Sequence, residues 1–541
     1  MKKNDKVELN ILRFAGAKGF AQHEGMAVFV ENALPGERVL ALIMKVQKNC
    51  AFAKTVEILT ASPDRVEPDC PYYKQCGSCT CRHMTYEATL RMKREDVRDA
   101  FAHIAGIEID VPPVIGMEQP LYYRNKVSMP VAGEKGAPVA GYYAPRSHRV
   151  TPVGDCLLAM DSGNAIVKIT LQWMTKFGIA PYDENTGSGL VRHIMARTSR
   201  GGNCMAVIVA AGKLPHGQEL AAMLRAAVPG ICSVQVNINK RRDNVILGDT
   251  CYVIWGEERL RDTLCGLSFD LSPLSFFQIN PVQTEKLYAA ALSFAGLTGN
   301  EEAVDLYCGA GTITLSMARN AKHVTGIEIV PPAIEDAKMN ARNNGISNVT
   351  FHAAAAEELL PRLVKEGLKP DIIMMDPPRK GAEESVLRAI AECGPSRVVY
   401  VSCDVHSQAR DVKILTGLGY KLEKVQPVDM FPWTEHVETV VLLSQLRQKP
   451  DDYIDVDIDV AELEGTSAET KATYEKIKKY VAEHNDGMKV SNLYIAQLKR
   501  KCGLALVENF NLPKSEDSRQ PQCPKEKEEA ILEALKAFQM I

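Results

Sequence analysis

The chain has 541 residues, of which 46% are hydrophobic and 24% charged, with 37 glycines and 29 prolines. This near-average composition excludes a mostly disordered, collagen-like or coiled-coil chain and predicts roughly three or four domains. The sequence contains no run of 18 apolar residues, and no apolar leader follows the N-terminal lysines. We therefore expect a cytoplasmic protein without a membrane span. The 64 basic and 67 acidic residues give a net charge of −3, so nucleic-acid contact would need a local basic face.

The first half of the chain is dominated by strand patterns. Residues 1–62 alternate apolar and polar positions in short runs separated by turn residues, which predicts a small β-barrel. A cysteine-dense loop follows, and then an amphipathic helix over 86–105, which we expect to pack on the domain formed by 269–446. From 121 to 265 the pattern again predicts mainly strands.

The second half changes character. Between 272 and 446, strands alternate with helical stretches of about 10–15 residues, which is typical of βαβ units around a parallel sheet. We therefore predict a multidomain α/β protein. Residues 451–464 carry seven acidic and no basic residues, which predicts a solvated linker. Within 447–541, two helical patterns after the linker predict a small helical accessory domain, in which Lys499, Arg500 and Lys501 would form a basic cluster.

A glycine-rich turn lies in the segment VDLYCGAGTITL (304–315). Gly309 and Gly311 would let the backbone approach a ligand where a strand passes into a helix. Glu328 ends the next strand, where a carboxylate suits the two hydroxyls of a ribose. Thr314 stands where a dinucleotide fingerprint has its third glycine. The pattern therefore favours S-adenosylmethionine over a dinucleotide.

Three further segments place reactive side chains at strand ends. MMDPPRKG (374–381) puts Asp376 and a stiff proline pair after a strand, and VVYVSCD (398–404) puts Cys403 at the end of another. FPWTEHVETVVLL (431–443) brings Glu438 to the start of the last strand. A lone cysteine at such a place would be an inert core residue. A thiol and a carboxylate on one sheet edge instead suggest a nucleophile and a base.

A group of thiols lies in the loop before the predicted helix. Cys70, Cys76 and Cys79 follow one another at spacings that both zinc and iron–sulfur clusters accept, and the spacing favours neither. Cys81 is a further thiol that could compete as a ligand.

The strand-end motifs together resemble the RNA uracil-C5-methyltransferase family. The segments that carry the resemblance are SFFQIN (275–280), DLYCGAG (305–311), MDPPRKG (375–381), VYVSCD (399–404) and DMFPWTEHVE (429–438). The match spans roughly residues 1–446. It implies Cys403 as the nucleophile that adds to uracil C6 and Glu438 as the base that removes the C5 proton. Residues that would line the cofactor and uracil pockets are Gln278, Tyr307, Thr312, Glu328 and Asp376.

The resemblance also implies an architecture. Residues 269–446 would form a Rossmann-like S-adenosylmethionine-dependent methyltransferase domain. In the ribosomal RNA branch of the family, an RNA-binding TRAM β-barrel (here 1–62) and a central β-rich domain with a [4Fe–4S] cluster (here 63–268) precede it, whereas the tRNA branch typically lacks both. The implied cluster ligands are Cys70, Cys76, Cys79 and, at a distance, Cys156.

The implied substrate is 23S rRNA, methylated at U1939, at U747 or at both, by an enzyme expected to be a monomer. A tRNA uracil-C5-methyltransferase and a non-catalytic iron–sulfur RNA-binding protein are the alternatives. Basic segments at 122–126, 146–149 and 239–242 are candidate RNA contacts. The chain departs from the family pattern at Asp404 (usually Asn), Ser407 (often Thr) and Ala355 (often polar).

Overall fold

The chain divides into two compact units, Met1–Arg447 and Gln448–Ile541. The predicted acidic linker at 451–464 lies outside the described residues. Among the helices that are described, none combines the length and apolar character needed to cross a membrane. The computed structural model describes residues 1–446, 474–485, 488–502 and 523–538.

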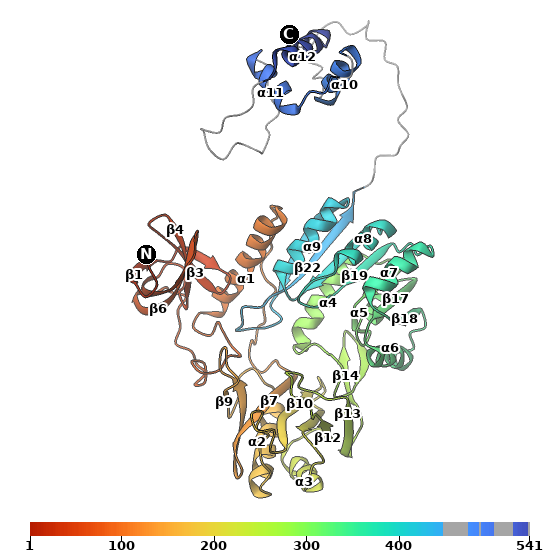
Figure 1. Ribbon diagram of the computed structural model, residues 1–541. Helices are drawn as coiled ribbons and strands as arrows, with labels where there is room; N and C mark the ends of the chain where they lie inside the picture. The colour runs from red at the N-terminus through yellow and green to blue at the C-terminus, as the bar shows by residue number, and fades with distance from the viewer. Residues whose placement is uncertain (447–473, 486–487, 503–522, 539–541) are drawn as a thin grey trace. The chain divides into compact units, whose positions relative to one another are not determined.

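The N-terminal sheet is six-stranded and curls around its own apolar core (Figure 1). Its strands are β1 (Lys6–Asn10), β2 (Arg13–Ala15), β3 (Lys18–His23), β4 (Met26–Glu31), β5 (Arg38–Val46) and β6 (Cys50–Thr60), paired in the order β1-β5-β6-β4-β3-β2. Because side chains alternate along a strand, Val28 and Val30 of β4 point into the core, while Phe29 and Glu31 share the opposite face.

The central sheet has seven strands of mixed direction, in the order β13-β12-β11-β10-β7-β8-β9. Every residue of β10 and β11 is buried, since helices pack on the sheet to form one apolar core that includes Trp173 and Leu220. The sequence patterns did not predict the two helices of this region, at residues 161–176 and 217–227. The elements are β7 (Lys126–Glu134), β8 (Ala137–Tyr143), β9 (Val150–Pro152), α2 (Asp161–Lys176), β10 (Val191–Thr198), β11 (Cys204–Ala210), α3 (Gly217–Ala227), β12 (Ile231–Ile238) and β13 (Thr250–Gly256).

A hairpin, β14 (Leu260–Leu264) and β15 (Leu267–Leu271), leads into the α/β sheet, whose order is β18-β17-β16-β19-β20-β22-β21. Strands β16 to β20 are parallel, and β22 runs antiparallel between β20 and β21. The elements are α4 (Pro281–Ala295), β16 (Glu302–Leu306), α5 (Thr312–Ala318), β17 (His323–Glu328), α6 (Pro331–Asn343), β18 (Val349–Ala353), α7 (Ala356–Lys365), β19 (Ile372–Met375), α8 (Glu384–Cys393), β20 (Arg397–Ser402), α9 (Val405–Gly417), β21 (Tyr420–Val428) and β22 (Glu438–Gln445).

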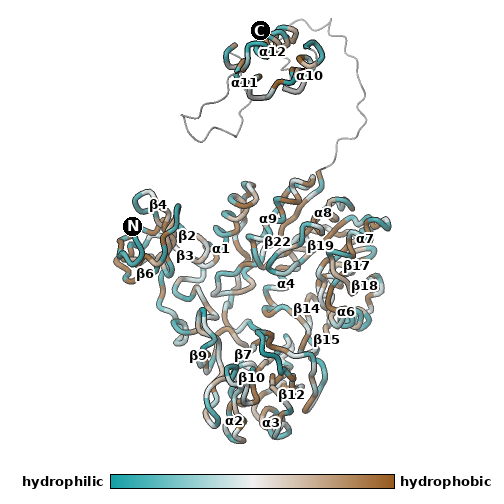
Figure 2. Tube along the Cα trace, viewed as in Figure 1, coloured by the Kyte–Doolittle hydropathy of each residue, from teal (hydrophilic) through white to brown (hydrophobic). Residues whose placement is uncertain are grey.

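The α/β sheet is apolar along its inner strands, which appear brown in Figure 2. The chain starts at β16, runs outward to β18 and then returns to the other side of β16 at β19. Such a reversal of strand order opens a crevice at the carboxyl ends of the strands, where open α/β sheets bind their ligands. This topology agrees with the expected Rossmann-like fold.

The helix predicted over 86–105 is present as α1 (Tyr86–Ala100), which continues into a π-helical turn, η1 (Phe101–Ala105). Thr85 caps its N-terminus by accepting a hydrogen bond from the Ala88 N–H. Val97 and Phe101 belong to the same buried core as residues of β20 and α9. The helix therefore packs on the α/β sheet.

A buried ion pair joins α1 to the loop before β22. The Lys93 Nζ donates to the Asp429 carboxylate at 2.5 Å, and both side chains are fully buried. The Tyr86 hydroxyl donates to the other oxygen of Asp429 at 2.6 Å, and Lys93 also donates to the Phe431 carbonyl at 3.1 Å. Each charge is thus paired and hydrogen-bonded, as burial requires.

The described part of the second unit contains α10 (Tyr474–His484), α11 (Asn492–Lys501) and α12 (Lys525–Ala537) around a small apolar core. Two members of the expected basic cluster of α11, Lys499 and Lys501, have side chains that the structure describes. Lys499 is only 6% exposed, and Lys501 is paired with Glu528 of α12. Lys501 of the expected basic cluster therefore takes part in the contact between α11 and α12.

Candidate functional site

The predicted nucleophile and base lie side by side because of the strand order. Cys403 directly follows β20, and Glu438 is the first residue of β22. These two strands pair antiparallel, with Ser402 opposite Thr439, so the end of one strand meets the start of the other. Asp376 follows β19, the other neighbour of β20. The structure thus brings three predicted site residues to one edge of the sheet.

The two carboxyl groups at this edge lie close enough to affect each other's ionisation. Glu438 is only 4% exposed. Burial, and then the neighbouring Asp376 carboxylate, raise its pKa well above the usual value, while Arg379 lowers it. Burial also raises the pKa of Asp376 to about 7. Because two adjacent carboxylates cannot both ionise cheaply, the pair favours holding one proton near neutral pH.

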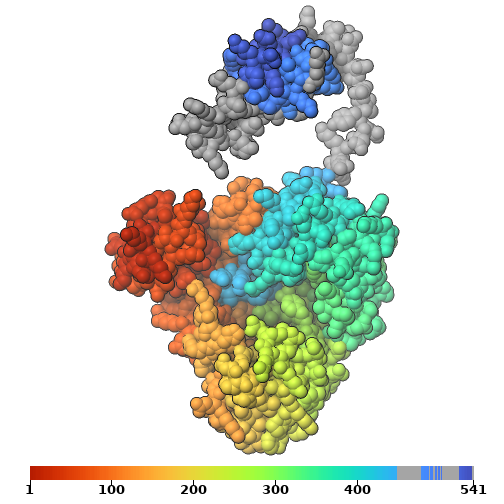
Figure 3. Space-filling view, in the orientation of Figure 1, coloured from red at the N-terminus to blue at the C-terminus, as the bar shows by residue number. Residues whose placement is uncertain are grey.

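The Cys403 thiol is half-buried and borders an open cleft of about 590 Å³, which we call the thiol cleft. Burial, followed by Glu438 and Asp376, raises the pKa of Cys403 to about 11, whereas the nearby Arg379 lowers it. The other walls of the cleft come from β2, β3, β4, α1 and η1. In Figure 3 it is the recess between the red N-terminal sheet and the cyan surface.

Arg379 is a site residue that the sequence patterns did not assign. It lies in the proline-containing loop after Asp376 and is the cation that faces both Cys403 and Glu438. A basic residue directly after a Pro-Pro pair at a strand end was the available signal.

We expect Arg379→Gln to raise the pKa of Cys403 further, because the cation that favours the thiolate is lost. Below the thiol pKa, each unit of upward shift lowers the thiolate fraction about tenfold. Activity at neutral pH should therefore fall about tenfold or more, and the deficit should shrink as the pH rises towards 10. Profiles of kcat/KM against pH for wild type, Arg379→Gln and Arg379→Lys test this. A loss in Arg379→Gln that is equal at all pH values would contradict it.

The glycine-rich turn lies at the switch point of the α/β sheet. Tyr307, Gly309 and Gly311 all have positive φ angles, of 66°, 54° and 83°. A Cβ on Gly311 would lie 3.1 Å from the Cβ of Ala337, so the close approach of α6 requires glycine there. Thr312 begins α5, and its hydroxyl is 2.8 Å from the hydroxyl of the buried Tyr288.

Glu328 lies opposite this turn at the end of β17. Its Oε2 accepts from the Gly309 N–H at 3.2 Å and its Oε1 from the Val330 N–H at 2.9 Å. These two contacts leave further acceptor capacity on both oxygens for hydroxyl donors. Ala355 lies between β18 and α7, and its methyl side chain cannot cap the N-terminus of α7.

Gln278 lies in the segment before α4, apart from the glycine-rich turn in sequence but tied to the loop that leads to Glu438. Its carbonyl accepts from the Asn125 Nδ2 at 3.0 Å. Two residues later, the Asn280 Nδ2 donates to the Met430 carbonyl at 3.0 Å. Phe276 in the same segment is 71% exposed.

The departures at Asp404 and Ser407 have a common local role. The Asp404 carboxylate accepts from the Ser407 N–H at 2.8 Å and caps α9. The Ser407 hydroxyl donates back to the Asp404 carbonyl at 3.0 Å. Since an aspartate and an asparagine cap equally well, the helix that follows Cys403 begins normally despite both substitutions.

The four cysteines named as cluster ligands surround a single small cavity, which we call the cysteine cavity. Cys70, Cys76, Cys79 and Cys156 all line it. Within the described residues, no three His, Cys, Asp or Glu side chains converge closely enough to hold one metal ion. Burial raises the pKa of Cys79 to about 12, and Arg124, followed by Arg82, opposes this shift.

Cys81 does not line the cysteine cavity. Its side chain is fully buried in a separate apolar cluster with Phe14, Met84 and Met92. Its thiol is 3.4 Å from the Thr80 hydroxyl. Cys81 therefore points away from the other thiols of its loop.

The loop of the cysteine cavity is hydrogen-bonded to the loop before β22. The N–H groups of Thr80 and Cys81 both donate to the Trp433 carbonyl at 3.1 Å. The Thr80 hydroxyl in turn accepts from the Glu435 N–H at 3.0 Å. The position of the segment that precedes Glu438 thus depends on the conformation of the cysteine loop.

The basic segments proposed as RNA contacts differ in their surroundings. In 122–126, Tyr123 is buried, so the expectation of an RNA contact is wrong for this side chain. Arg124 is half-buried, and its Nη1 donates to the Ser78 hydroxyl at 2.9 Å beside the cysteine cavity. In 146–149, Arg146 forms an ion pair with Glu31 at 3.0 Å. In 239–242, Arg241 pairs with Asp243 at 2.6 Å.

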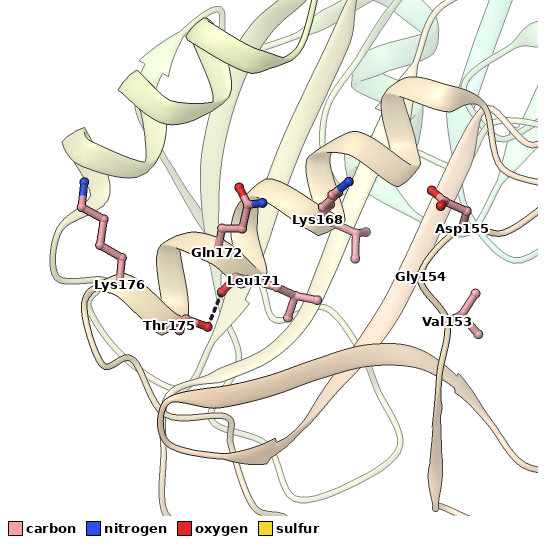
Figure 4. A pocket seen from close by; sticks show the side chains of 9 residues that line it. Val153, Gly154, Asp155, Lys168, Leu171, Gln172, Thr175 and Lys176 are labelled. Carbon is pink, nitrogen blue, oxygen red and sulfur yellow. Dashed lines mark hydrogen bonds between the residues drawn. The ribbon is translucent and has the colours of Figure 1, made fainter.

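A cavity of about 560 Å³ lies away from all of these residues (Figure 4). It separates the exposed side of α2, with Lys168 and Lys176, from the segment Val153–Asp155. No cysteine, serine or histidine lines it. We call it the α2 cavity.

Comparisons with known proteins agree with this geometry. The family described as "tRNA (Uracil-5-)-methyltransferase" matches residues 233–446, which include the whole α/β sheet. An uncharacterized RNA methyltransferase of Clostridium tetani is 44% identical over 452 residues, 83% of this chain and 98% of the relative. Another, of Halalkalibacterium halodurans, is 45% identical over 446 residues, 82% of this chain and 97% of the relative.

A solved structure shares the fold. The crystal structure of Pyrococcus abyssi tRNA (uracil-54, C5)-methyltransferase in complex with S-adenosyl-L-homocysteine superposes with a TM-score of 0.65 at 24% identity, over 80% of this chain and 100% of that chain. The family match over 233–446 and the two bacterial relatives, which match over nearly their whole length, show that the chain belongs to the RNA uracil-C5-methyltransferase family.

Proposed function

We propose that this protein transfers a methyl group from S-adenosylmethionine to C5 of a uracil in RNA. The observation that carries the proposal is the juxtaposition of Cys403, Glu438 and Asp376 at one sheet edge, next to a glycine-rich turn faced by Glu328. When bound, S-adenosylmethionine supplies an electrophilic methyl group. Gly309, Gly311 and Glu328 fit such a ligand, because the turn approaches closely and the carboxylate can accept from ribose hydroxyls.

The protein's own residues account for the remaining chemistry. The Cys403 thiolate adds to C6 of uracil and pushes the electron pair of the C5–C6 double bond towards the O4 carbonyl as an enolate. C5 then becomes nucleophilic enough to take the methyl group. Glu438 removes the C5 proton, the double bond re-forms and the bond from sulfur to C6 breaks, which returns the thiolate. Asp376, with its raised pKa, can hold a proton beside the uracil.

We further propose 23S rRNA as the substrate, at the uridines that the family modifies. The support is the presence of an N-terminal six-stranded sheet and of four cysteines around one cavity, both of which the resemblance associates with the ribosomal RNA branch. A tRNA substrate is the alternative, because the Pyrococcus abyssi tRNA (uracil-54, C5)-methyltransferase superposes over 80% of this chain, which is more than the α/β domain alone.

Mapping of 5-methyluridine decides between these substrates. We expect 23S rRNA from a strain without the gene to lack one or two 5-methyluridines, and the purified protein to restore them in vitro, while tRNA is unchanged. Loss of the modification from tRNA alone would assign the enzyme to tRNA. An unchanged pattern in both RNAs would refute methylation of either.

A [4Fe–4S] cluster in the cysteine cavity is part of the proposal. Four cysteines suit a cubane, in which each thiolate binds a different iron and the sulfurs stay further apart than around a single ion. Arg124 and Arg82 would offset the negative charge of such a group. Cys70, Cys76, Cys79 and Cys156 would hold it, and its contribution would be structural, through the bonds from the cysteine loop to Trp433.

We expect anaerobically purified protein to be brown, to absorb near about 400 nm and to contain about four irons per chain. Cys79→Ser should lose most of the iron, because this side chain lines the cysteine cavity. Cys81→Ser is the matched control and should retain it, since Cys81 packs in a different cluster. Stoichiometric zinc without iron in the wild-type protein would overturn the assignment.

A further inference from the structure

A third cavity, of about 440 Å³, lies in the central region between the end of β7, the turn from β8 to β9 and the segment before β10. We call it the β8–β9 cavity. None of the residues discussed for methyl transfer lines it. Those that do are Pro130, Val131, Ala132, Gly133, Tyr143, His148, Val150, Pro181, Tyr182, Asp183, Glu184, Asn185 and Arg192.

Arg192 is a buried cation in the wall of this cavity. The residue is 5% exposed, and its guanidinium lies over the Tyr182 ring, 4.5 Å from the centroid. Its Nη1 donates to the Arg241 carbonyl at 2.5 Å, but its buried Nε has no partner. Among the described residues, no carboxylate forms an ion pair with it. A buried guanidinium in this state favours an anionic acceptor from outside the protein.

The same cavity has aromatic rings beside the cation. The rings of Tyr143 and His148 are 5.3 Å apart and tilted by 43°, and Tyr182 lies under Arg192. A cation next to aromatic faces is the combination with which proteins hold single-stranded nucleic acid, because every base can stack and every phosphate is an anion.

The acidic residues at the rim do not neutralise Arg192. The Asp183 carboxylate accepts from the Asn185 N–H at 2.9 Å within its own loop. Glu184 lies 3.4 Å from the Nδ1 of His148. Both carboxylates are therefore engaged locally, and the guanidinium is left for a ligand.

The β8–β9 cavity is connected to the thiol cleft through one strand of the N-terminal sheet. Arg146, in the turn between β8 and β9, pairs with Glu31 of β4 at 3.0 Å. Phe29, two residues earlier on the same face of β4, lines the thiol cleft. In Figure 3 the orange turn stands beside the red sheet next to the recess. An RNA strand that enters the cleft can thus continue along β4 to this cavity.

We propose that the β8–β9 cavity binds an unpaired nucleotide of the RNA substrate outside the target uridine, with its base stacked on Tyr143 and His148 and its phosphate on Arg192. This inference rests on the proposed RNA methylation. It makes the cavity a second anchoring point, which raises affinity and orients the RNA while the chemistry takes place at Cys403.

The test uses the full-length protein and 23S rRNA transcribed in vitro, with tRNA transcript as a second probe. We expect Tyr143→Ala to raise KM and the dissociation constant for the methylated RNA about tenfold, as loss of one stacked base does, while kcat stays within twofold. Tyr143→Phe keeps the ring and should behave as wild type. Arg192→Met should weaken binding and lower the slope of log Kd against log salt by about 0.7, because one phosphate contact is lost.

The controls separate this cavity from a general loss of charge and from the proposed function. Lys168→Gln removes one exposed cation of the α2 cavity in the same region and should leave KM and the salt slope unchanged. Melting temperatures identify misfolded variants, and ultraviolet cross-linking of wild-type protein should attach RNA to the peptide containing Tyr143. Active protein with an unchanged KM in Tyr143→Ala and no such cross-link refutes the cavity alone. Absence of methylation by wild type refutes the proposed function instead.

Discussion

Cys403→Ala should lose methyl transfer by at least about 10⁴-fold, because no other side chain at this edge of the sheet can add to C6 of uracil. The thiol is half-buried next to Glu438 and Asp376, and the glycine-rich turn does not line the thiol cleft. Binding of S-adenosylmethionine, measured by calorimetry, should therefore stay within about twofold of wild type. Turnover within tenfold of wild type would remove Cys403 from the mechanism.

RNA that carries 5-fluorouridine at the target position sharpens this test. A base can remove hydrogen from C5 as a proton but cannot remove fluorine as a cation, so elimination fails and the wild-type enzyme should stop as a covalent RNA–protein adduct. Cys403→Ala should form none. Cys232→Ser, a half-buried thiol in the central sheet, is the matched control and should still form the adduct at the wild-type rate.

Glu438→Gln should accumulate a methylated covalent adduct, visible as a shifted band on a denaturing gel. The amide keeps the shape of the buried side chain but cannot accept the C5 proton, so addition and methylation proceed and elimination does not. Turnover should fall by at least about 10³-fold. The yield of adduct should approach one RNA per protein in a single-turnover experiment.

The double variant Cys403→Ala/Glu438→Gln should show no shifted band, which establishes that the adduct forms through the thiol. In the adduct of Glu438→Gln, digestion of the RNA and of the protein should leave a peptide that contains Cys403 and carries the mass of a nucleotide. A Glu438→Gln protein that is inactive, folded and free of adduct would assign Glu438 to an earlier step than proton removal.

The sequence indicates the main site residues because of a simple rule of parallel sheets. Cys403 and Asp376 each follow an apolar strand, and carboxyl ends of parallel strands meet on one edge. Glu438 could be placed there as well, because it begins the last strand, which runs in the opposite direction. Their catalytic roles stay predictions until variants are measured.

Other features depend on tertiary structure that no local pattern contains. Arg124 belongs to a basic segment whose composition is typical of an exposed loop, yet packing partly buries its side chain beside the cysteine cavity. The helix α2 contains Ile166, Val167 and Thr170, whose branched side chains favour strands locally, and only its packing on the central sheet makes it a helix. Lys93 and Asp429 are 336 residues apart in the chain, so their pairing could not be read from either segment.

The Lys93–Asp429 pair also limits how this protein can evolve. A substitution of Lys93 alone would leave a carboxylate buried without its cation, at a cost of about 3–5 kcal/mol. Replacing both residues by apolar side chains of similar volume can be nearly neutral, but the hydroxyl of Tyr86 would then lose its acceptor as well. Substitutions at Tyr86, Lys93 and Asp429 must therefore occur together. We expect relatives either to retain Tyr86, Lys93 and Asp429 together or to have exchanged all three.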